Sequence, residues 1–420
     1  MKIFLFLPKI EQLKVLYISY DGMTDPLGQS QVIPYLAGLS AKGHDFFLIS
    51  CEKKAATSQE YIAIAQLLKQ NNIRWLPVSY TSKPPVISTL LDLRNINNLA
   101  YKVIKEQKIE TVHCRSYIAA LAGLKMKKKY GVKFIFDMRG FWVDERVDGK
   151  IWNIKNPLYK LIYNYFKKKE NQFLINADQI ISSTENAKNE MLKWKVPCQP
   201  LPIQVIPCCV DLNLFNRKNI NEEKKTVWRK KLNIAEDNFV LSYLGSIGTW
   251  YLLDEMLDFF KVLINQKRNS IFLIITGESP QYIIDAAKKK NIPAEKIVVQ
   301  EAARNEVPEL LSLSHISIFF IKPVYSKKAS SPAKMGEIMG MGIPLICNGN
   351  IGDTDEILAN TDAGLIINGF NCIEYTNAVE KLNLLLHADP DKIRNVAKKY
   401  FSLEDGIEKY DSVYRRIKTE

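Results

Sequence analysis

The segment SSPAKMGEIMGMGIP, residues 330–344 of this 420-residue chain, gives the clearest indication of its fold. It follows a short apolar run, and its Ser331 and Pro332 are residue types typical of a helix N-cap and a first helical position. The stretch therefore predicts a helix that begins soon after a strand. Free backbone N–H groups at such a helix start, with Lys334 nearby, suit a diphosphate. One turn later, Glu337 can accept two hydrogen bonds from a ribose diol; an ordinary capped helix with a surface glutamate is the alternative.

Around this stretch, short apolar runs alternate with longer amphipathic segments. In the C-terminal half we expect strands at residues 239–244, 272–276, 297–300, 316–321 and 344–347. We expect helices at residues 252–265, 282–290, 307–312, 333–341, 376–386 and 393–400. Continuous apolar strands separated by helices are typical of a parallel sheet that is covered on both faces.

The N-terminal half shows the same alternation. Its expected strands are residues 15–19, 46–50, 111–114, 133–137, 179–182 and 203–207, and its expected helices are residues 28–42, 119–129 and 185–194. A polar, charged segment at residues 208–235 separates the two halves. The sequence therefore predicts two doubly wound, Rossmann-like α/β domains, with functional loops at the carboxyl ends of the strands and a cleft between the domains.

The positive charge of the chain lies in one half. The formal net charge is +13, from 58 lysines and arginines against 45 aspartates and glutamates. Residues 1–200 carry 30 basic and 17 acidic side chains, whereas residues 201–420 carry 28 of each. A basic half indicates a partner with phosphate groups or an anionic surface, although a merely solvated surface is equally compatible. A nucleic-acid-binding protein should contain a dedicated basic and aromatic module, and none is evident, so no nucleic-acid partner is expected.

Cysteine and histidine usage indicates an intracellular protein without a metal site. The seven cysteines form no C-x-x-C pair, which is typical of reduced cytosolic thiols. The four histidines show no metal-ligand spacing, so we expect no metal. The apolar run at residues 3–8 is far shorter than the roughly 20 residues of a membrane helix, so we expect a cytoplasmic protein.

Peripheral contact with the inner membrane face is a further expectation. Basic stretches occur at residues 125–133 and 167–169, and the second follows an aromatic segment at residues 159–166. Basic and aromatic side chains together suit an interfacial helix on an anionic membrane. A packed helix with a solvated end is the alternative.

Residues 337–344 resemble the donor-binding signature of family 4 glycosyltransferases of the GT-B fold, in which a glutamate precedes a small-residue helix and a Gly-x-Pro. Further segments resemble the family's motifs in the same order: residues 25–30, 115–117, 137–142, 205–211 followed by Phe215, 244–248 and 276–278. The ordered set covers nearly the whole chain. It implies an acceptor-binding domain at residues 1–208 and a nucleotide-sugar-binding domain at residues 209–400. Residues 401–420 would hold the family's final helix, which crosses back to the N-terminal domain.

The resemblance implies a retaining-type glycosyltransferase of the hexosyltransferase type. The expected partners are a nucleotide-sugar donor and a glycan or lipid-linked acceptor, in the biosynthesis of a cell-surface polysaccharide. No cofactor beyond the donor is implied, because N–H dipoles and lysine charge would stabilise the leaving diphosphate. A nucleotide-sugar epimerase of the same architecture and an inactive glycosyltransferase-like subunit are the alternatives.

The resemblance also implies the site residues. The residues expected to bind the donor are Gly28, Gly245, Ser246, Gly277, Arg304, Ser330, Ser331, Lys334 and Glu337, and the expected catalytic residues are Asp137, Arg139 and Lys334. Two departures from the family pattern stand out. Ala329 occupies the place of the first of two glutamates, and hydroxyl residues replace the usual arginine and lysine after Gly245.

Overall fold

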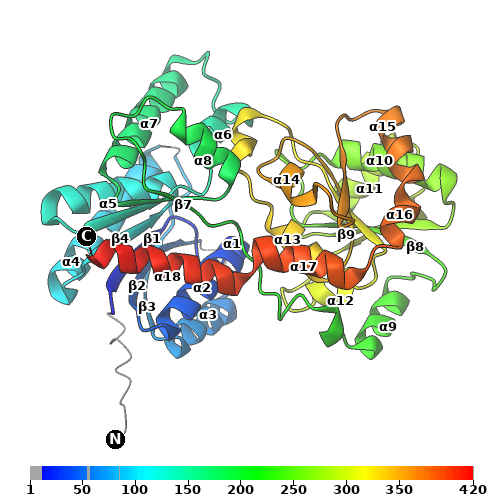
Figure 1. The fold of residues 1–420 in the computed structure, drawn as a ribbon, viewed down its shortest axis with the longest axis horizontal. Coiled ribbons are helices and arrows are strands. Elements are labelled where there is room, and N and C mark those ends of the chain that lie inside the picture. Colours follow the sequence, from blue (N-terminus) through cyan, green and yellow to red (C-terminus); the bar gives the residue numbers. More distant parts are fainter. Residues whose placement is uncertain (1–11, 54–56, 85, 420) are drawn as a thin grey trace, which may run out of the picture. The chain divides into compact units, whose positions relative to one another are not determined.

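The computed structural model describes residues 12–53, 57–84 and 86–419, and in it the chain forms two compact units (Figure 1). Unit 1 consists of two segments of the chain: one that ends at Pro207 and one that begins at Leu403. Unit 2 comprises Cys208–Ser402.

Unit 1 is built on a seven-stranded parallel sheet with the strand order β3-β2-β1-β4-β5-β6-β7. Its strands are β1 (Lys14–Ser19), β2 (Asp45–Glu52), β3 (Ile73–Ser79), β4 (Thr111–Arg115), β5 (Lys133–Asp137), β6 (Gln179–Ser182) and β7 (Ile203–Val205). The central strands are buried along almost their whole length because helices cover both faces of the sheet. This is the doubly wound arrangement that the apolar runs predict.

The helices of unit 1 come from both ends of the chain. They are α1 (Pro26–Gln31), α2 (Ile33–Ala41), α3 (Ser58–Gln70), α4 (Ile87–Gln107), α5 (Ser116–Tyr130), α6 (Trp142–Asp148), α7 (Pro157–Asn176), α8 (Glu185–Leu192) and α18 (Leu403–Thr419). Helix α18 lies beside α2, so the last residues of the chain pack with some of the first (Figure 1).

Unit 2 is built on a six-stranded sheet with the order β10-β9-β8-β11-β12-β13. Its strands are β8 (Phe239–Leu244), β9 (Ser270–Ile275), β10 (Ile297–Gln300), β11 (Ile316–Phe319), β12 (Leu345–Asn348) and β13 (Gly364–Ile367). Its α-helices are α9 (Glu222–Lys231), α10 (Leu253–Gln266), α11 (Pro280–Lys289), α12 (Val307–Leu311), α13 (Ala333–Gly340), α14 (Thr354–Leu358), α15 (Cys372–Glu380), α16 (Leu382–Leu386) and α17 (Pro390–Phe401). Three 3₁₀ turns complete it: η1 (Arg217–Asn219), η2 (Ala294–Lys296) and η3 (Tyr325–Ala329).

Two predicted helices differ from the observed ones. The helix predicted over residues 28–42 is interrupted at Val32, where the backbone leaves the helical region. Pro34 lies just beyond and has no N–H to donate, so the ladder of i to i−4 hydrogen bonds cannot continue through it. The helix predicted over residues 376–386 is likewise two helices, α15 and α16.

The glycines of α13 let neighbouring segments approach the helix closely. A Cβ on Gly336 would lie 2.8 Å from the Cβ of Phe401 on α17, and one on Gly340 would lie 2.9 Å from Cδ2 of Leu212. The buried guanidinium of Arg394 then donates to the carbonyls of Gly340 and Leu212. The small residues of this stretch therefore serve packing, because they let α17 and Leu212 approach α13 closely.

Candidate active site

The predicted donor-binding residues of unit 2 follow the carboxyl ends of neighbouring parallel strands. Gly245 follows β8 and Gly277 follows soon after β9, and the Gly245 N–H donates to the backbone of β9 over 2.9 Å. Arg304 lies after β10, and Ser330 and Ser331 lie after β11. Since β10, β9, β8 and β11 are adjacent, these loops gather on one edge of the sheet, where doubly wound folds bind ligands.

Lys334 extends from α13 into a cage of two tyrosines. Its Nζ donates to the hydroxyl of Tyr243 over 2.9 Å and lies 3.5 Å from the centre of the Tyr251 ring. Burial holds the pKa of Lys334 well below its ordinary value, and the nearby Glu337 carboxylate offsets this only in part. An anion bound beside Nζ would favour the charged form, so the lysine suits a leaving diphosphate.

Glu337 and Arg304, both predicted donor-binding residues, form an ion pair. A guanidinium nitrogen of Arg304 donates to Oε1 of Glu337, which is buried, whereas the Arg304 side chain is 35% exposed. Arg304 also stacks over the ring of Phe215, with the guanidinium carbon 4.8 Å from the ring centre. The carboxylate is therefore held in place by a partly exposed cation, and its second oxygen could accept from a hydroxyl.

The conformation of the loop after β8 requires a glycine at position 245. Gly245 has a φ of +118°, and a Cβ there would lie 2.8 Å from Nζ of Lys334. Ser246 is exposed, and its carbonyl accepts a hydrogen bond from the Tyr243 hydroxyl at 2.5 Å. Tyr243 thus joins the glycine loop to the lysine.

The serines before α13 are placed differently from the prediction. The helix begins at Ala333, with Pro332 as its N-cap and no side-chain capping bond. Ser331 does not cap the helix: its Oγ accepts a hydrogen bond from the N–H of Cys208 over 3.0 Å. The predicted N-cap is wrong because the start of unit 2 competes for the hydroxyl. The Ser330 N–H donates to the carbonyl of Lys327 over 3.1 Å, within the preceding turn.

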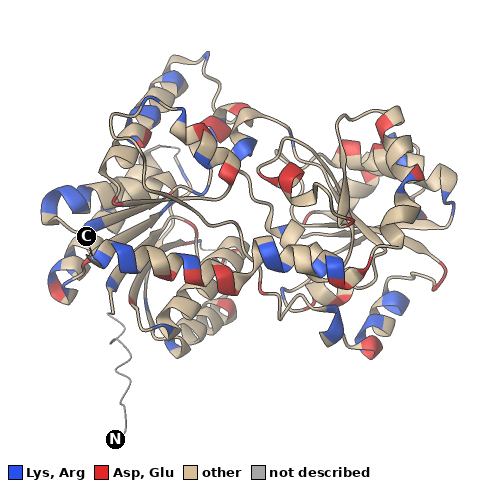
Figure 2. Ribbon diagram, in the orientation of Figure 1, with Lys and Arg blue, Asp and Glu red and all other residues tan. Residues whose placement is uncertain are grey.

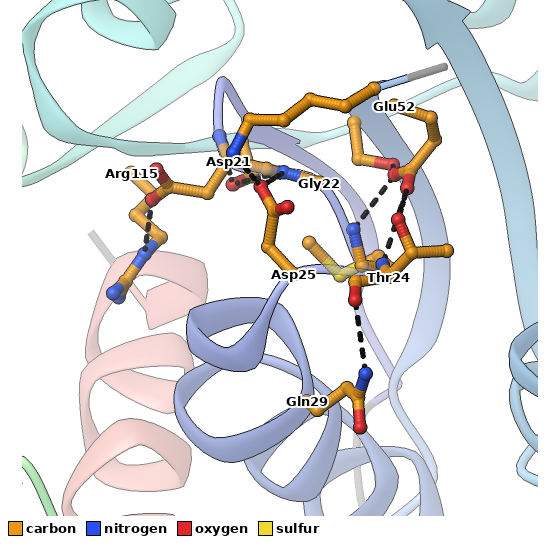
Figure 3. Close-up of polar contacts among 11 residues, drawn as sticks. Asp21, Gly22, Thr24, Asp25, Gln29, Glu52 and Arg115 are labelled. Carbon is orange, nitrogen blue, oxygen red and sulfur yellow. Dashed lines mark hydrogen bonds and ion pairs between the residues drawn. The ribbon is translucent and has the colours of Figure 1, made fainter. Parts of the chain in front are cut away.

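Gly28 of unit 1 allows α1 to approach the loop after β1. A Cβ on Gly28 would lie 2.2 Å from the carbonyl oxygen of Gly22. The same loop is held from the other side by Glu52 at the end of β2, which accepts hydrogen bonds from the N–H groups of Met23 (2.7 Å) and Thr24 (3.2 Å) (Figure 3). Gly28 is therefore a packing residue of this loop in the structure, and Glu52 organises the loop without any motif that marks it in the sequence.

Asp137 and Arg139, predicted to be catalytic, lie together at the carboxyl end of β5. Asp137 is fully buried, and its Oδ2 accepts a hydrogen bond from the hydroxyl of Tyr410 on α18 at 3.0 Å. His113 Nε2 lies 3.4 Å from the same oxygen. Arg139 has a φ of +56°, and its Nη1 lies 3.8 Å from Oδ1 of Asp137. The aspartate can thus fix the arginine and the loop that carries it.

The charges around Asp137 keep it ionised. Burial by itself raises the pKa of Asp137, but the positive charge of Arg139, the hydrogen bond from His113 and the positive charge of Arg115 outweigh burial and lower it. Burial lowers the pKa of His113, which indicates a neutral ring. A ring protonated at Nε2 would donate to Asp137 and accept at Nδ1 from the Tyr414 hydroxyl, 2.7 Å away. The aspartate is an internal anion that balances nearby arginines.

The described residues contain neither a metal cluster nor a membrane span. In residues 12–53, 57–84 and 86–419, no three His, Cys, Asp or Glu side chains are grouped so as to hold a metal ion. A metal-free reaction remains a prediction. Across those same stretches, every helix is too short or too polar to cross a bilayer.

Two family models match consecutive parts of the chain. The model of Glycosyltransferase Family 4 matches residues 28–214, and the model of Glycosyl transferases group 1 matches residues 224–400. Together they account for most of both units. No curated protein sequence matched the chain.

Solved structures share the fold over almost the whole chain. A glycosyltransferase from Rickettsia africae has a TM-score of 0.71 at 18% identity, with 97% of this chain and 98% of that chain covered. Sucrose-phosphate synthase from Thermosynechococcus elongatus has a TM-score of 0.74 at 13% identity, with 97% and 99% covered. The Anabaena protein HepE, solved with UDP-glucose, has a TM-score of 0.68 at 12% identity, with 96% and 100% covered. At such identities these similarities establish the fold, and the family models add the class of enzyme. The chain therefore belongs to the family 4 glycosyltransferases and has the two-domain, Rossmann-like GT-B fold.

Proposed function

We propose that the protein is a retaining glycosyltransferase that moves a hexose from a nucleoside-diphosphate sugar to a glycan or lipid-linked acceptor during cell-surface polysaccharide synthesis. The observation that carries the donor half of this proposal is the cluster of Lys334, Glu337 and Arg304 at one edge of the sheet of unit 2. A nucleoside diphosphate presents a ribose diol and a diphosphate, which need a carboxylate and a cation respectively. UDP-glucose bound to the Anabaena HepE is compatible with this donor class.

The proposed mechanism uses electrostatic stabilisation and no covalent intermediate. Glu337 accepts from the ribose hydroxyls, while Lys334 and the N–H group of Ser331 stabilise negative charge as the diphosphate leaves. The bond between the anomeric carbon and the diphosphate oxygen breaks, and the acceptor oxygen bonds to the same carbon from the same face. The leaving phosphate accepts the proton of that acceptor hydroxyl, and the configuration at the sugar is retained. Gly245, Ser246 and Gly277 let the backbone approach the donor.

In unit 1 we propose that Arg139 contacts the sugar or the acceptor and that Asp137 acts through Arg139. Asp137 has no exposed surface, so it is a positioning residue in this proposal. The carboxyl edge of this sheet also carries Arg115, whose Nε lies 3.4 Å from Oδ2 of Asp21 (Figure 3). Arginines at this edge favour an acceptor with a phosphate, as in a lipid-linked sugar.

The donor proposal is tested by thermal shift against UDP, GDP, ADP, CDP and their common sugar conjugates. One nucleotide should raise the melting temperature by mass action. Glu337→Gln should weaken binding of that nucleotide by about 10- to 100-fold, because it removes a charge-assisted hydrogen bond. Glu380→Gln, on the exposed surface of unit 2, is the matched control and should bind like the parent.

The outcomes separate the alternatives. If no nucleotide raises the melting temperature, an inactive subunit is favoured. If NMR shows that the sugar of the nucleotide-sugar is converted to its epimer in the absence of an acceptor, an epimerase is favoured. Transfer that gives a product with inverted anomeric configuration would contradict the retaining mechanism and leave the donor site intact.

A further inference from the structure

Helix α7 is apolar on two opposite faces. Its inner face is buried in unit 1 through Phe166, Glu170, Phe173 and Leu174. A helix that packs on one side of a sheet ordinarily presents polar side chains on the other side. The outward face of α7 does not follow this rule.

The outward face of α7 carries large exposed apolar side chains. Leu158 is 57% exposed, Leu161 67% and Tyr165 47%. These positions are three and four residues apart, so they line one face of the helix. Ile151 (46%) and Ile154 (44%), in the segment that leads into α7, extend the exposed apolar set. Each of these side chains leaves apolar area in water, which a lipid or protein partner could cover.

Lysines border this apolar face, with almost no acidic residues among them. Between Lys150 and Asn176 the sequence contains six lysines and a single acidic residue, Glu170. Glu170 is buried and pairs with Lys167, which also reaches Oδ2 of Asp144 over 3.2 Å. The remaining lysines, at positions 150, 155, 160, 168 and 169, leave the surface strongly positive, and basic positions recur along the ribbon of α7 (Figure 2).

We propose that this surface, made of the outward face of α7 and residues 150–156, docks on an anionic lipid bilayer. Leucine, isoleucine and tyrosine side chains would enter the boundary between headgroups and acyl chains, and the lysines would contact anionic headgroups. The charge argues for lipid over a second copy of the chain, because two such lysine-rich faces repel each other. Docking would bring unit 1 to a lipid-linked acceptor, and in that respect it rests on the proposed function; the binding itself involves no sugar transfer.

Vesicle flotation of the full chain tests the proposal. The protein should float with vesicles of phosphatidylcholine mixed with phosphatidylglycerol and stay behind with phosphatidylcholine alone, at low salt. The triple variant Leu158→Ser, Leu161→Ser, Tyr165→Ser should lose at least about tenfold in lipid partitioning, since the apolar anchors are gone. Lys160→Glu with Lys168→Glu should lose about fivefold for each lysine.

Matched controls lie on unit 2. Ile373 and Leu384 are 73% and 74% exposed, so Ile373→Ser with Leu384→Ser removes similar apolar area elsewhere, and Lys381→Glu changes the charge elsewhere. These controls should float like the parent. All variants should show the parent's melting temperature and its thermal shift with nucleotide, which separates loss of docking from failure of the donor site.

Three results would overturn the proposal. The first is a triple variant that floats like the parent. The second is a parent protein that does not float with vesicles containing phosphatidylglycerol. The third is a parent that sediments as a dimer while the triple variant is a monomer, because that result would assign the face to a second copy of this chain.

Discussion

At the scale of single residues, burial and charge oppose each other at Lys334 of the proposed donor site. Its ammonium group lies against the rings of Tyr243 and Tyr251, with a single hydrogen bond to a hydroxyl. Desolvation disfavours the charge, whereas aromatic faces and a bound anion favour it. The protonation state of this lysine should therefore depend on whether a diphosphate is bound.

Proton uptake on binding follows from this balance. In the free protein, burial lowers the pKa of Lys334 well below its usual value, and a bound diphosphate should raise it. Between the two pKa values, binding takes up a proton, so the affinity for the nucleoside diphosphate should fall as the pH rises through that window. Calorimetric titration in two buffers of different ionisation enthalpy measures the uptake. Lys334→Met should take up fewer protons on nucleotide binding than the parent, because it lacks the titrating ammonium group. Equal proton uptake in the variant and the parent would show that Lys334 is not the group that gains the proton.

Gly245 offers a second test at this scale. Gly245→Ala should cost about 1–3 kcal/mol in backbone strain and should also weaken nucleotide binding, because its Cβ would displace Nζ of Lys334. Gly248→Ala is the matched control, since Gly248 has a φ of +136° but open space around the position of its Cβ. Denaturant unfolding and nucleotide affinity, measured on both variants, separate strain from obstruction. Equal nucleotide affinity in the two variants would rule out the obstruction.

At the scale of elements, the loops that follow the strands are held from neighbouring strands. In unit 1, Glu52 at the end of β2 accepts from the backbone of the loop after β1 and from the hydroxyls of Thr24 (2.8 Å) and Ser50 (2.5 Å). Lys53 pairs with Asp25 of the same loop over 2.8 Å. One carboxylate thus satisfies several polar donors of this loop.

Glu52→Gln should loosen this loop and leave the donor site unchanged. The amide has one accepting oxygen, so at least one loop donor loses its partner, at a cost of about 1–3 kcal/mol. The expected result is a lower melting temperature and a higher KM for the acceptor, with an unchanged thermal shift for the nucleotide. Glu60→Gln, at an exposed helix N-terminus, is the control and should leave the acceptor KM unchanged. A parental acceptor KM in Glu52→Gln would show that the loop does not contribute to acceptor binding.

At the scale of the whole molecule, the two ends of the chain complete one unit. The chain leaves unit 1 at Pro207, builds unit 2, and returns with α18. Helix α18 supplies Tyr410 and Tyr414 to the buried centre of unit 1, and its Asp411 lies 2.9 Å from Nε2 of His44. Unit 1 therefore has a complete core only after the last residues of the chain are in place.

Tyr410→Phe tests how much the contact between α18 and Asp137 contributes to the stability of the protein. Asp137 would lose its hydroxyl partner while remaining buried and ionised, at a cost of about 1–3 kcal/mol in unfolding free energy. Tyr400→Phe on α17 is a control at a tyrosine that is only partly buried, and it should have little effect. If the two variants unfold at the same denaturant concentration, the hydrogen bond to Asp137 adds nothing to stability.

Most of the fold could be predicted, and the exceptions are instructive. Strands β5, β6, β8 and β10 have the predicted bounds, and the other predicted strands differ by a residue or two at their ends. No strand was expected at β3 or β13, which lie at the edges of their sheets. An edge strand is only partly covered, so β3 and β13 lack the continuous apolar run that marks a buried strand.

Sequence patterns alone were enough to predict the two parallel sheets, the family and the excess of positive charge in the N-terminal half, and to mark Lys334 and Glu337 as candidates. These follow from periodicity and motif order, which depend on residues close together in the chain. The folded structure was needed to show that Arg304 pairs with Glu337, that two tyrosines enclose Lys334, and that Asp137 is buried beneath α18. Such contacts join residues up to 273 positions apart, and they arise from the order of the strands in each sheet and the return of the last helix. No local pattern encodes them, because each depends on which elements become neighbours once the chain has folded.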